Sequence, residues 1–206
     1  MAKVKNVLVT CGPTWVPIDD VRVISNISTG ELGQRLAQGL AQKGARVTVL
    51  LGPVTQQLVS KPVRVLNFRF FDELRDLLNQ ELKKSYDVVI HAAAVSDFQL
   101  KRPFKAKLRS GKRLTLELVA TAKLIEGIKR KNPNIFLVGF KLEPTLNKNS
   151  VRRFARDLFK KAKCDLVVVN SLNRGQYSAF IVNKDNKIIA GVKNRKSIVQ
   201  ALIKTI

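Results

Sequence analysis

The sequence predicts a single α/β domain built on a doubly wound, Rossmann-like and mostly parallel sheet with helices on both faces. Apolar runs typical of buried parallel strands alternate along the chain with longer amphipathic segments typical of helices. Hydrophobic residues make up 45% of the 206 residues, which is enough for one sizeable core. No linker, internal repeat or low-complexity segment divides the sequence. Residues 1–206 are therefore expected to form one domain.

The elements follow one another regularly from the N-terminus. Central strands are predicted where Val, Leu and Ile form continuous runs. A strand of a parallel sheet is covered on both faces, so side chains pointing to either face are apolar. In order, these runs are VLVT, VTVL, DVVIHAAA, NIFLVGF and DLVVVN. Helices are predicted where apolar residues recur every three or four positions, as in ELGQRLAQGLAQKG. The predicted strands are 5–11, 46–51, 62–67, 86–93, 134–140 and 165–170, and the predicted helices are 30–43, 71–84, 120–131, 149–163 and 195–205.

Two segments depart from this alternation. Residues 98–119 are rich in cations and are predicted to form a flap. Its second arm, RLTLELV at 113–119, alternates like an exposed strand and has no obvious partner strand in its own chain. Residues 176–191 place the turn NKDNK between two apolar arms, which predicts a C-terminal β-hairpin at one edge of the sheet.

The chain is strongly basic, with 38 Lys and Arg against 15 Asp and Glu and a formal net charge of +23. A field of this size attracts polyanions. Three explanations stay open: solvated faces of a Lys- and Arg-rich protein, an anionic substrate site, and nucleic-acid binding. The sequence lacks zinc-ligand spacing, a helix-turn-helix pair and basic–aromatic alternation, so nucleic acid is expected to bind only non-specifically if at all.

The sequence predicts a cytoplasmic protein that does not enter membranes. No apolar run approaches twenty residues, and the start, MAKVKN, leads into a strand rather than a signal peptide. Cys11 and Cys164 are too few for a disulfide framework and are expected to be free thiols.

The segment between the first strand and the first helix, residues 11–33, predicts an anion site. A loop rich in Gly, Ser and Thr before a helix N-terminus directs backbone N–H groups and the helix dipole at an anion. Gly12, Gly30 and Gly33 could let the backbone approach a ligand, and Ser28 and Thr29 could cap the helix or bind phosphate. The spacing is too long for the dinucleotide fingerprint, and a Walker lysine is absent.

Candidate side chains cluster where predicted strands end. Arg22 is a bidentate anion donor, and Asn26 could donate to a carbonyl oxygen or hold a left-handed turn. After the strand at 86–93, Ala92 to Ala94 leave room for a ligand, and Asp97 could bind a sugar, a base or Mg²⁺, or could simply cap a turn. Phe140 could stack on a base or pack in the core. The flap cations could close on a phosphate or form a solvated run; they are Lys101, Arg102, Lys105, Lys107, Arg109, Lys112 and Arg113.

The single histidine, His91, lies on an apolar strand and is expected to be a hydrogen-bonded core residue. The sequence offers no Ser-His-Asp or Cys-His set, no metal cluster and no clear carboxylate pair. Chemistry by positioning and charge neutralisation, as in phosphoryl or nucleotidyl transfer, is therefore favoured over catalysis by a protein nucleophile.

These motifs, in this order, resemble phosphopantothenoylcysteine synthetase in its stand-alone form, a member of the DNA/pantothenate metabolism flavoprotein C-terminal domain family. The resemblance runs from about residue 5 to residue 183. It is carried by GPTWVPIDDVRVISNISTGELG, HAAAVSDF, KLRSGKRLTLELV, VGFKLE and ARDLFKKAKCDLVVVN.

The resemblance implies a ligase of coenzyme A biosynthesis that joins L-cysteine to 4′-phosphopantothenate through an acyl-nucleotide. CTP or ATP would be consumed with Mg²⁺, nucleoside monophosphate and pyrophosphate would be released, and no flavin would be needed. It also implies a homodimer in which a strand or flap of the partner covers the site. Many relatives carry a flavin-dependent decarboxylase domain first, so here a separate decarboxylase protein is expected.

By motif, the resemblance implies catalytic roles for Asn26 and Lys107. Asn26 would hold the acyl-nucleotide, and Lys107, with Lys105 as the alternative, would neutralise the triphosphate. The implied nucleotide contacts are Gly12, Ala92, Ala93, Ala94, Asp97, Lys107 and Phe140. The implied substrate loop holds Arg22, Asn26, Ser28, Thr29 and Gly30. Metal ligands are not predicted.

Several positions depart from the family pattern and leave the choice between CTP and ATP open. Val16 stands where Glu is frequent, and Glu31 stands where Lys is frequent. Leu158 and Ala162 stand where the bifunctional bacterial form has lysines, and the segment after the flap reads ATAKLI.

Two other function classes are alternatives to this ligase. A nicotinamide-dependent Rossmann oxidoreductase needs a short Gly-rich turn and usually Tyr-x-x-x-Lys, which neither tyrosine provides. A nucleic-acid-binding protein depends on the charge alone.

Overall fold

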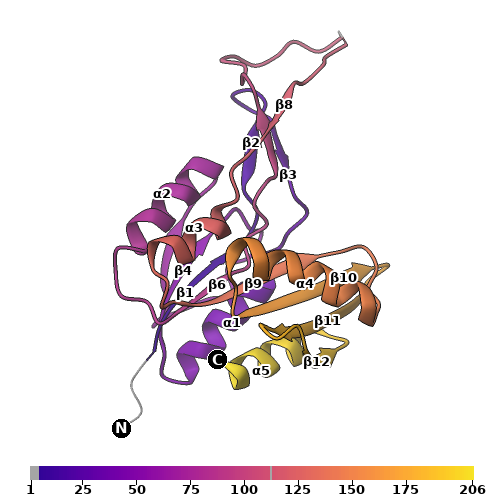
Figure 1. Cartoon of the computed structure of the whole chain (residues 1–206). Helices are drawn as coiled ribbons and strands as arrows, with labels where there is room; N and C mark the ends of the chain where they lie inside the picture. Colours follow the sequence, from indigo (N-terminus) through magenta and orange to yellow (C-terminus); the bar gives the residue numbers. More distant parts are fainter. Residues whose placement is uncertain (1–4, 112) are drawn as a thin grey trace.

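The computed structural model describes residues 5–111 and 113–206, and its centre is an eight-stranded sheet in the order β12-β11-β10-β9-β6-β1-β4-β5 (Figure 1). The pairs from β10 to β5 are parallel, whereas β11 and β12 add an antiparallel hairpin at the β10 edge. The strands are β1 (Asn6–Cys11), β4 (Arg46–Leu51), β5 (Arg64–Asn67), β6 (Val88–His91), β9 (Phe136–Leu142), β10 (Leu166–Asn173), β11 (Gln176–Asn183) and β12 (Ile188–Val192). The predicted α/β class with its C-terminal hairpin is confirmed.

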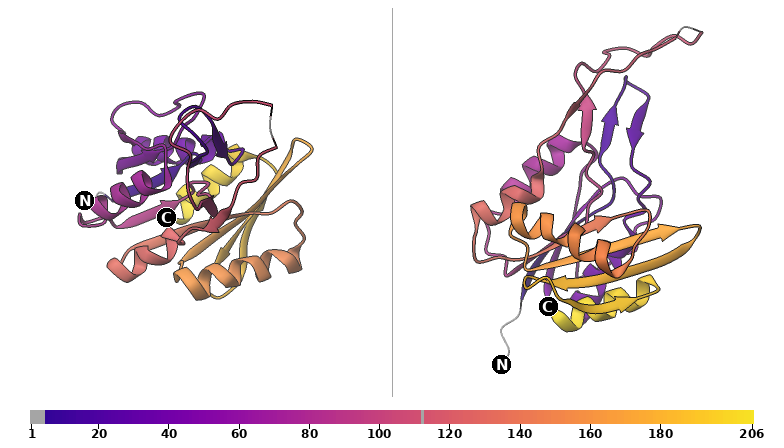
Figure 2. Two further views of the ribbon diagram at one scale, coloured as in Figure 1. Left: turned by 90° about the horizontal axis from the view of Figure 1, so that it is seen from above. Right: turned by 45° about the vertical axis from the view of Figure 1, so that its right-hand side comes forward.

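Helices cover both faces of the sheet, as the continuous apolar runs predicted (Figure 2). One face carries α1 (Glu31–Gln42) and α5 (Arg195–Thr205), and the other carries α2 (Phe71–Glu81), α3 (Leu124–Lys131) and α4 (Lys148–Ala162). Successive side chains of a strand point to opposite faces, so in β1 Val7 and Val9 join the α1–α5 core while Leu8 joins the other. All three are fully buried.

The order of the strands reverses at β1. The chain moves from β1 to β4 and β5 on one side and then returns to β6 on the other side of β1. In open α/β sheets, ligands bind at the carboxyl ends of the strands next to such a reversal. Here the two strand ends are joined by a 2.9 Å hydrogen bond from the Ala94 N–H to the Gly12 carbonyl.

Two short hairpins rise from this edge and form what we call the stalk, residues 15–25, 98–111 and 113–120 (Figures 1 and 2). The first pairs β2 (Trp15–Pro17) with β3 (Val23–Ser25), and the second pairs β7 (Phe98–Leu100) with β8 (Leu118–Ala120). The Phe104 N–H donates to the Ile18 carbonyl over 2.9 Å and ties the two hairpins together.

Three sequence predictions need correction here. Residues 12–30 are not an open loop, since they contain the β2–β3 hairpin. The segment RLTLELV is not without a partner, because its last residues join β8 and pair with β7 of the same chain, Leu118 facing Leu100. The helix expected at 120–131 begins only at Leu124, because Ala120 still belongs to β8.

The expectations for the thiols are confirmed. Cys11 and Cys164 are free and buried, and burial raises the pKa of each to about 12. Both are therefore inert thiols within the core at neutral pH. In the described part of the chain, no helix combines the length and the apolar character needed to cross a membrane.

Candidate active site

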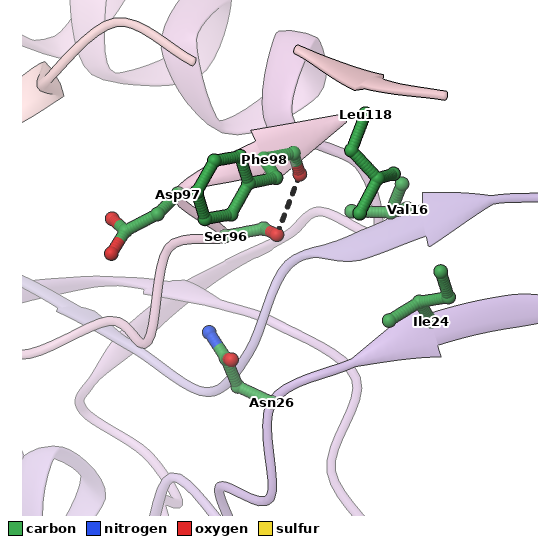
Figure 3. Close-up of a pocket in the computed structure, with 7 residues that line it drawn as sticks. All are labelled: Val16, Ile24, Asn26, Ser96, Asp97, Phe98 and Leu118. Carbon is green, nitrogen blue, oxygen red and sulfur yellow. Dashed lines mark hydrogen bonds between the residues drawn. The ribbon is translucent and has the colours of Figure 1, made fainter. Parts of the chain in front are cut away.

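A pocket of about 310 Å³ lies at the base of the stalk, between the two hairpins (Figure 3). We call it the base pocket. Its floor and walls mix apolar side chains of the hairpins with three polar residues, which is the composition of a typical small-molecule site. The lining residues are Val16, Ile24, Asn26, Ser96, Asp97, Phe98 and Leu118.

Asn26 connects the end of β3 to the end of β6. Its Nδ2 donates to the Ala94 carbonyl over 3.0 Å and approaches the Val95 carbonyl at 3.4 Å. The residue has no positive φ, so it does not hold a left-handed turn. Figure 3 shows its amide pointing toward the Ser96–Asp97 segment across the pocket. The structure thus brings the predicted Asn26 and the predicted alanine segment together.

The alanine segment is anchored to β1 by its backbone. The Ala92 N–H donates to the Thr10 carbonyl over 2.9 Å, and the Thr10 hydroxyl accepts from Ala93 N at 3.3 Å. The same hydroxyl lies 2.9 Å from His91 Nδ1. His91 is buried, and burial lowers its pKa to about 4. It is therefore a neutral core residue, as predicted, and it positions the strand end rather than reaching the pocket.

Ser96 is fixed by two threonines that sequence reasoning missed. The buried Thr14 hydroxyl accepts from Ser96 N at 2.8 Å, and the Thr121 hydroxyl donates to the Ser96 carbonyl over 2.6 Å. The Ser96 hydroxyl itself donates to the Phe98 carbonyl over 2.8 Å (Figure 3). The signal that could have found Thr14 is the Gly-Pro-Thr triplet after the first strand, in which Thr14 is the third residue past the strand end.

Asp97 is an exposed carboxylate with a cationic partner. Lys123 Nζ lies 2.6 Å from its Oδ1, and the two side chains are 55% and 66% exposed. Lys123 belongs to the ATAKLI segment, where the sequence departs from the family pattern. An exposed pair of this kind contributes little to stability, so Asp97 and Lys123 are free to separate when a ligand binds.

The predicted glycines lie where the chain packs closely against itself, and their contact with a ligand stays a prediction. A Cβ on Gly12 would lie 3.0 Å from Gly52 Cα, and a Cβ on Gly33 would lie 2.3 Å from Cys11 Cβ. A Cβ on Gly30 would meet Val54 at 2.9 Å. Gly12 and Gly30 also have positive φ angles of 84° and 65°. These glycines therefore allow the chain to pack closely against itself around the site.

Gly30 caps α1, and the residues before it shape the approach. The predicted cap by Ser28 or Thr29 is therefore wrong, although the Thr29 hydroxyl accepts from Glu31 N at 3.4 Å. The Ser28 N–H donates to the Asn26 carbonyl over 3.0 Å and closes the turn after Asn26. Phe140 is half-buried on the α1–α5 face of β9 and packs against that core.

A second cavity of about 530 Å³ lies at the far end of the stalk, and we call it the tip pocket. It is lined by Arg22, Lys107, Leu108, Arg109 and Ser110. Three cations around one cavity make it a site for an anion.

Asp19 organises the tip pocket. Its carboxylate is buried and accepts from the backbone N–H groups of Leu108 at 3.0 Å, Val21 at 3.0 Å and Arg22 at 2.8 Å. The Leu108 N–H first, and then the other two, hold the pKa of Asp19 below its ordinary value. Arg22 Nη2 in turn donates to the Leu108 carbonyl over 3.0 Å. Leu108 of the flap is thus bonded to the β2–β3 turn through both its N–H and its carbonyl.

The predicted site residues therefore fall into two groups. Asn26 and Asp97 line the base pocket, and the Ala94 carbonyl is bonded to Asn26 beside it. Arg22 and Lys107 line the tip pocket, at the end of the stalk that projects from the body (Figure 1). Lys105, Lys107 and Arg109 are exposed, and Lys112 lies outside the described residues. Across residues 5–111 and 113–206, no group of three or more His, Cys, Asp or Glu could hold a metal ion.

Comparison with known proteins gives consistent matches. Residues 2–205 match the DNA/pantothenate metabolism flavoprotein C-terminal domain family. The coenzyme A biosynthesis bifunctional protein CoaBC of Thermococcus kodakarensis is 40% identical over 169 residues, covering 82% of this chain and 41% of that protein. CoaBC of Bacillus subtilis is 33% identical over 171 residues, covering 82% and 40%. The chain spans less than half the length of these relatives.

Solved structures share the fold. The crystal structure of the DNA/pantothenate metabolism flavoprotein from Streptococcus pneumoniae has a TM-score of 0.87 and 27% identity, with 98% of both chains covered. A Cab2 variant in complex with phosphopantothenate-cysteine has a TM-score of 0.77 at 20% identity, with 98% of this chain and 87% of that one covered. The second likeness concerns the fold alone.

Proposed function

This chain belongs to the DNA/pantothenate metabolism flavoprotein C-terminal domain family, and from that premise we propose that it joins L-cysteine to 4′-phosphopantothenate in coenzyme A biosynthesis. The relatives that support this proposal are bifunctional coenzyme A biosynthesis proteins, of which the chain matches less than half.

The reaction would proceed in two steps. A carboxylate oxygen of 4′-phosphopantothenate attacks the α-phosphorus of CTP or ATP, and the bond to pyrophosphate breaks. The cysteine amine then attacks the acyl carbon, the nucleoside monophosphate leaves with the bonding electrons, and the nitrogen loses a proton to give the amide. Both steps depend on positioning and on stabilising charge, so neither needs a protein nucleophile.

The observation that carries this proposal is the placement of Asn26. Its amide borders the base pocket next to the strand reversal, where ligands of open α/β sheets bind. An amide nitrogen has two hydrogens, and the 3.0 Å bond to Ala94 occupies one of them. The other makes the longer hydrogen bond of 3.4 Å to the Val95 carbonyl, and it would turn from there to the carbonyl oxygen of the acyl-nucleotide.

The nucleotide would lie over the alanine segment next to Gly12, because the small side chains of Ala92 to Ala94 are only partly buried. Asp97 would exchange Lys123 for a sugar or base group, and the exposed part of Phe140 would contact the base. Either CTP or ATP fits this description. Lys107 would bind the triphosphate and promote loss of pyrophosphate.

Magnesium would enter with the triphosphate rather than bind a preformed protein cage. In the part of the chain that the structure describes, Asp97 is the sole carboxylate lining the base pocket, and it is paired with Lys123. Mg²⁺ commonly takes one or two carboxylates together with substrate phosphates and waters. When bound, it would neutralise charge on the leaving pyrophosphate.

We also propose that the active unit is a homodimer. The stalk extends away from the body of the sheet (Figure 1), and the tip pocket is lined by flap residues, so Lys107 would reach the nucleotide of a neighbouring subunit. Large apolar side chains are exposed along the stalk and offer a contact surface, namely Val21, Val23, Ile24, Phe98, Phe104, Leu114 and Leu118.

Pyrophosphate release tests the proposal. The protein is incubated with Mg²⁺, 4′-phosphopantothenate and either CTP or ATP, with and without cysteine. Release with one nucleotide, stoichiometric amide formation when cysteine is added, and no release without phosphopantothenate are expected. Absence of release with both nucleotides would refute the proposed ligase activity.

A further inference from the structure

Helix α4 has a strongly one-sided charge. Six of its fifteen residues are Lys or Arg, and Asp157 is its single acidic residue. Four of the cations recur every four residues and are all exposed, while Val151, Ala155 and Ala162 on the inner side are buried against the sheet. We call these four the α4 stripe: Lys148, Arg152, Arg156 and Lys160.

The stripe is a regular array of charge. Four residues of an α-helix advance about 6 Å along its axis, so the stripe spans about 18 Å in three equal steps and winds slowly around the helix. Its partner should therefore carry negative charges at similarly regular intervals. The phosphate backbone of a nucleic acid has this property, with one charge per nucleotide.

This arrangement works against the stability of the helix. Like charges four residues apart repel each other. A cation in the first turn, such as Lys148, also opposes the helix dipole, and the first turn contains no acidic residue. Lys160, by contrast, lies in the last turn, where a cation is favoured by the dipole.

Some cations of the other helices are paired with acidic residues, whereas in the described part of the chain others, such as Lys196 and Lys204 of α5, have no ion pair. Arg35 pairs with Glu31 at 2.7 Å, Arg75 pairs with Asp72 and Asp76, and Lys129 pairs with Asp165 at 2.7 Å. Among the described residues, none of the four α4 stripe side chains has an ion pair. The stripe is therefore distinguished by the regular spacing of its cations along one helix, and not by the lack of ion pairs alone.

We propose that the α4 stripe binds the phosphate backbone of a nucleic acid without reading its sequence. The aromatic residues of the helix, Phe154 and Phe159, are half-buried and pack against the core, so the stripe offers no stacking surface for bases. A membrane fits less well, because the apolar face of α4 is covered by the sheet and cannot insert into lipid.

The test measures binding of fluorescent oligouridylate and of a DNA duplex, each about 20 units long, by anisotropy between about 50 and 200 mM salt. The variant R152Q/R156Q removes two charges from the stripe, and K196Q/K204Q removes two exposed charges from α5 as the matched control. For the single strand, loss of two phosphate contacts should reduce the slope of log K against log salt by about 1.4. The control should keep the wild-type slope.

Equal weakening in both variants would overturn the proposal, since net charge alone would then explain binding. The absence of binding to either nucleic acid would also overturn the proposal. So would a result in which polyglutamate displaces the fluorescent probe as effectively as unlabelled RNA does. K148Q/K160Q provides a second pair in the same stripe should the first variant not fold. Pyrophosphate release should be unchanged in R152Q/R156Q, because the stripe lies outside the proposed active site; a loss of ligase activity would contradict a separate surface.

Discussion

Nδ2 of Asn26 donates a 3.0 Å hydrogen bond to the carbonyl oxygen of Ala94, and this contact joins residues 68 positions apart in the sequence. It fixes the end of the β2–β3 hairpin to the end of β6. The same side chain borders the base pocket. Asn26 is therefore both a connection between two strand ends and the polar group best placed to meet a reacting carbonyl.

Replacing Asn26 with Ala should slow amide formation more than activation. If the amide steadies the acyl carbonyl, its loss should cost about 2.7–4 kcal/mol, or roughly 10²–10³-fold in rate. Pyrophosphate release in the absence of cysteine reports activation, and transfer from the preformed acyl-nucleotide reports the second step. Equal losses in both steps would indicate that Asn26 only holds Ala94 and the loop.

Replacing Lys107 with Gln should reduce activation, because a charge on the triphosphate is lost. We expect a decrease of roughly ten- to a hundredfold, as for removal of one charged hydrogen bond. Folding stability should change by less than about 0.5 kcal/mol, since the side chain is exposed. The matched variant is Lys105→Gln; full activity in K107Q together with a loss in K105Q would move the role to Lys105.

Replacing Asp19 with Asn should release the flap from the β2–β3 turn. The carboxylate accepts three backbone N–H groups, whereas an amide presents one acceptor and one donor to them. Hydrogen exchange at the Leu108 amide should therefore become faster in D19N. The pKa of Asp19 is lowered, so the carboxylate holds the flap fully at any pH above the ordinary carboxyl pKa. This contribution is lost only when the pH falls through the lowered value. Unchanged protection of Leu108 in D19N would show that Asp19 does not hold the flap.

The core of the fold was predictable because its determinants are local. Strands covered on both faces appear as uninterrupted apolar runs, and α5 occupies the predicted 195–205. The stalk was not predictable in the same way. β2 and β3 have three residues each, β2 ends at Pro17, and every residue of β3 is exposed, so neither shows the periodicity of a longer strand.

The site was predictable in part for a related reason. The carboxyl ends of parallel strands meet at one edge, so Asn26 and Ala94 could be expected near each other. Asp19 and Thr14 were missed because their partners, Leu108 and Ser96, are more than eighty residues away in the sequence. The separation of Lys107 from the base pocket depends on how the two hairpins pack, which no local pattern records.

His91 should make folding stability depend on pH between about 4 and 6.5. Its folded pKa of about 4 lies below the ordinary value, so the unfolded chain binds more protons in this range. Stability is therefore complete above pH 6.5 and falls as the pH decreases. Between pH 7 and pH 5 the wild type should lose about 2 kcal/mol more than His91→Asn in urea unfolding. Parallel pH curves for the two proteins would show that His91 is not held neutral.

Mixing two inactive variants should restore activity if the site is shared between subunits. In a mixed dimer of N26A and K107Q, one site combines the intact Asn26 of one subunit with the intact Lys107 of the other, and the second site lacks both. Random exchange gives mixed dimers in half of the population, so about a quarter of the wild-type activity should return.

The net charge of +23 on each subunit opposes this association, and apolar contact along the stalk must outweigh it. Salt screens the repulsion, so the dimer measured by light scattering should become tighter as ionic strength rises. If each flap instead closes over its own base pocket, every site of a mixed dimer contains one damaged residue and activity does not return. A mass near 23 kDa at high protein concentration, with full activity, would likewise exclude the shared site.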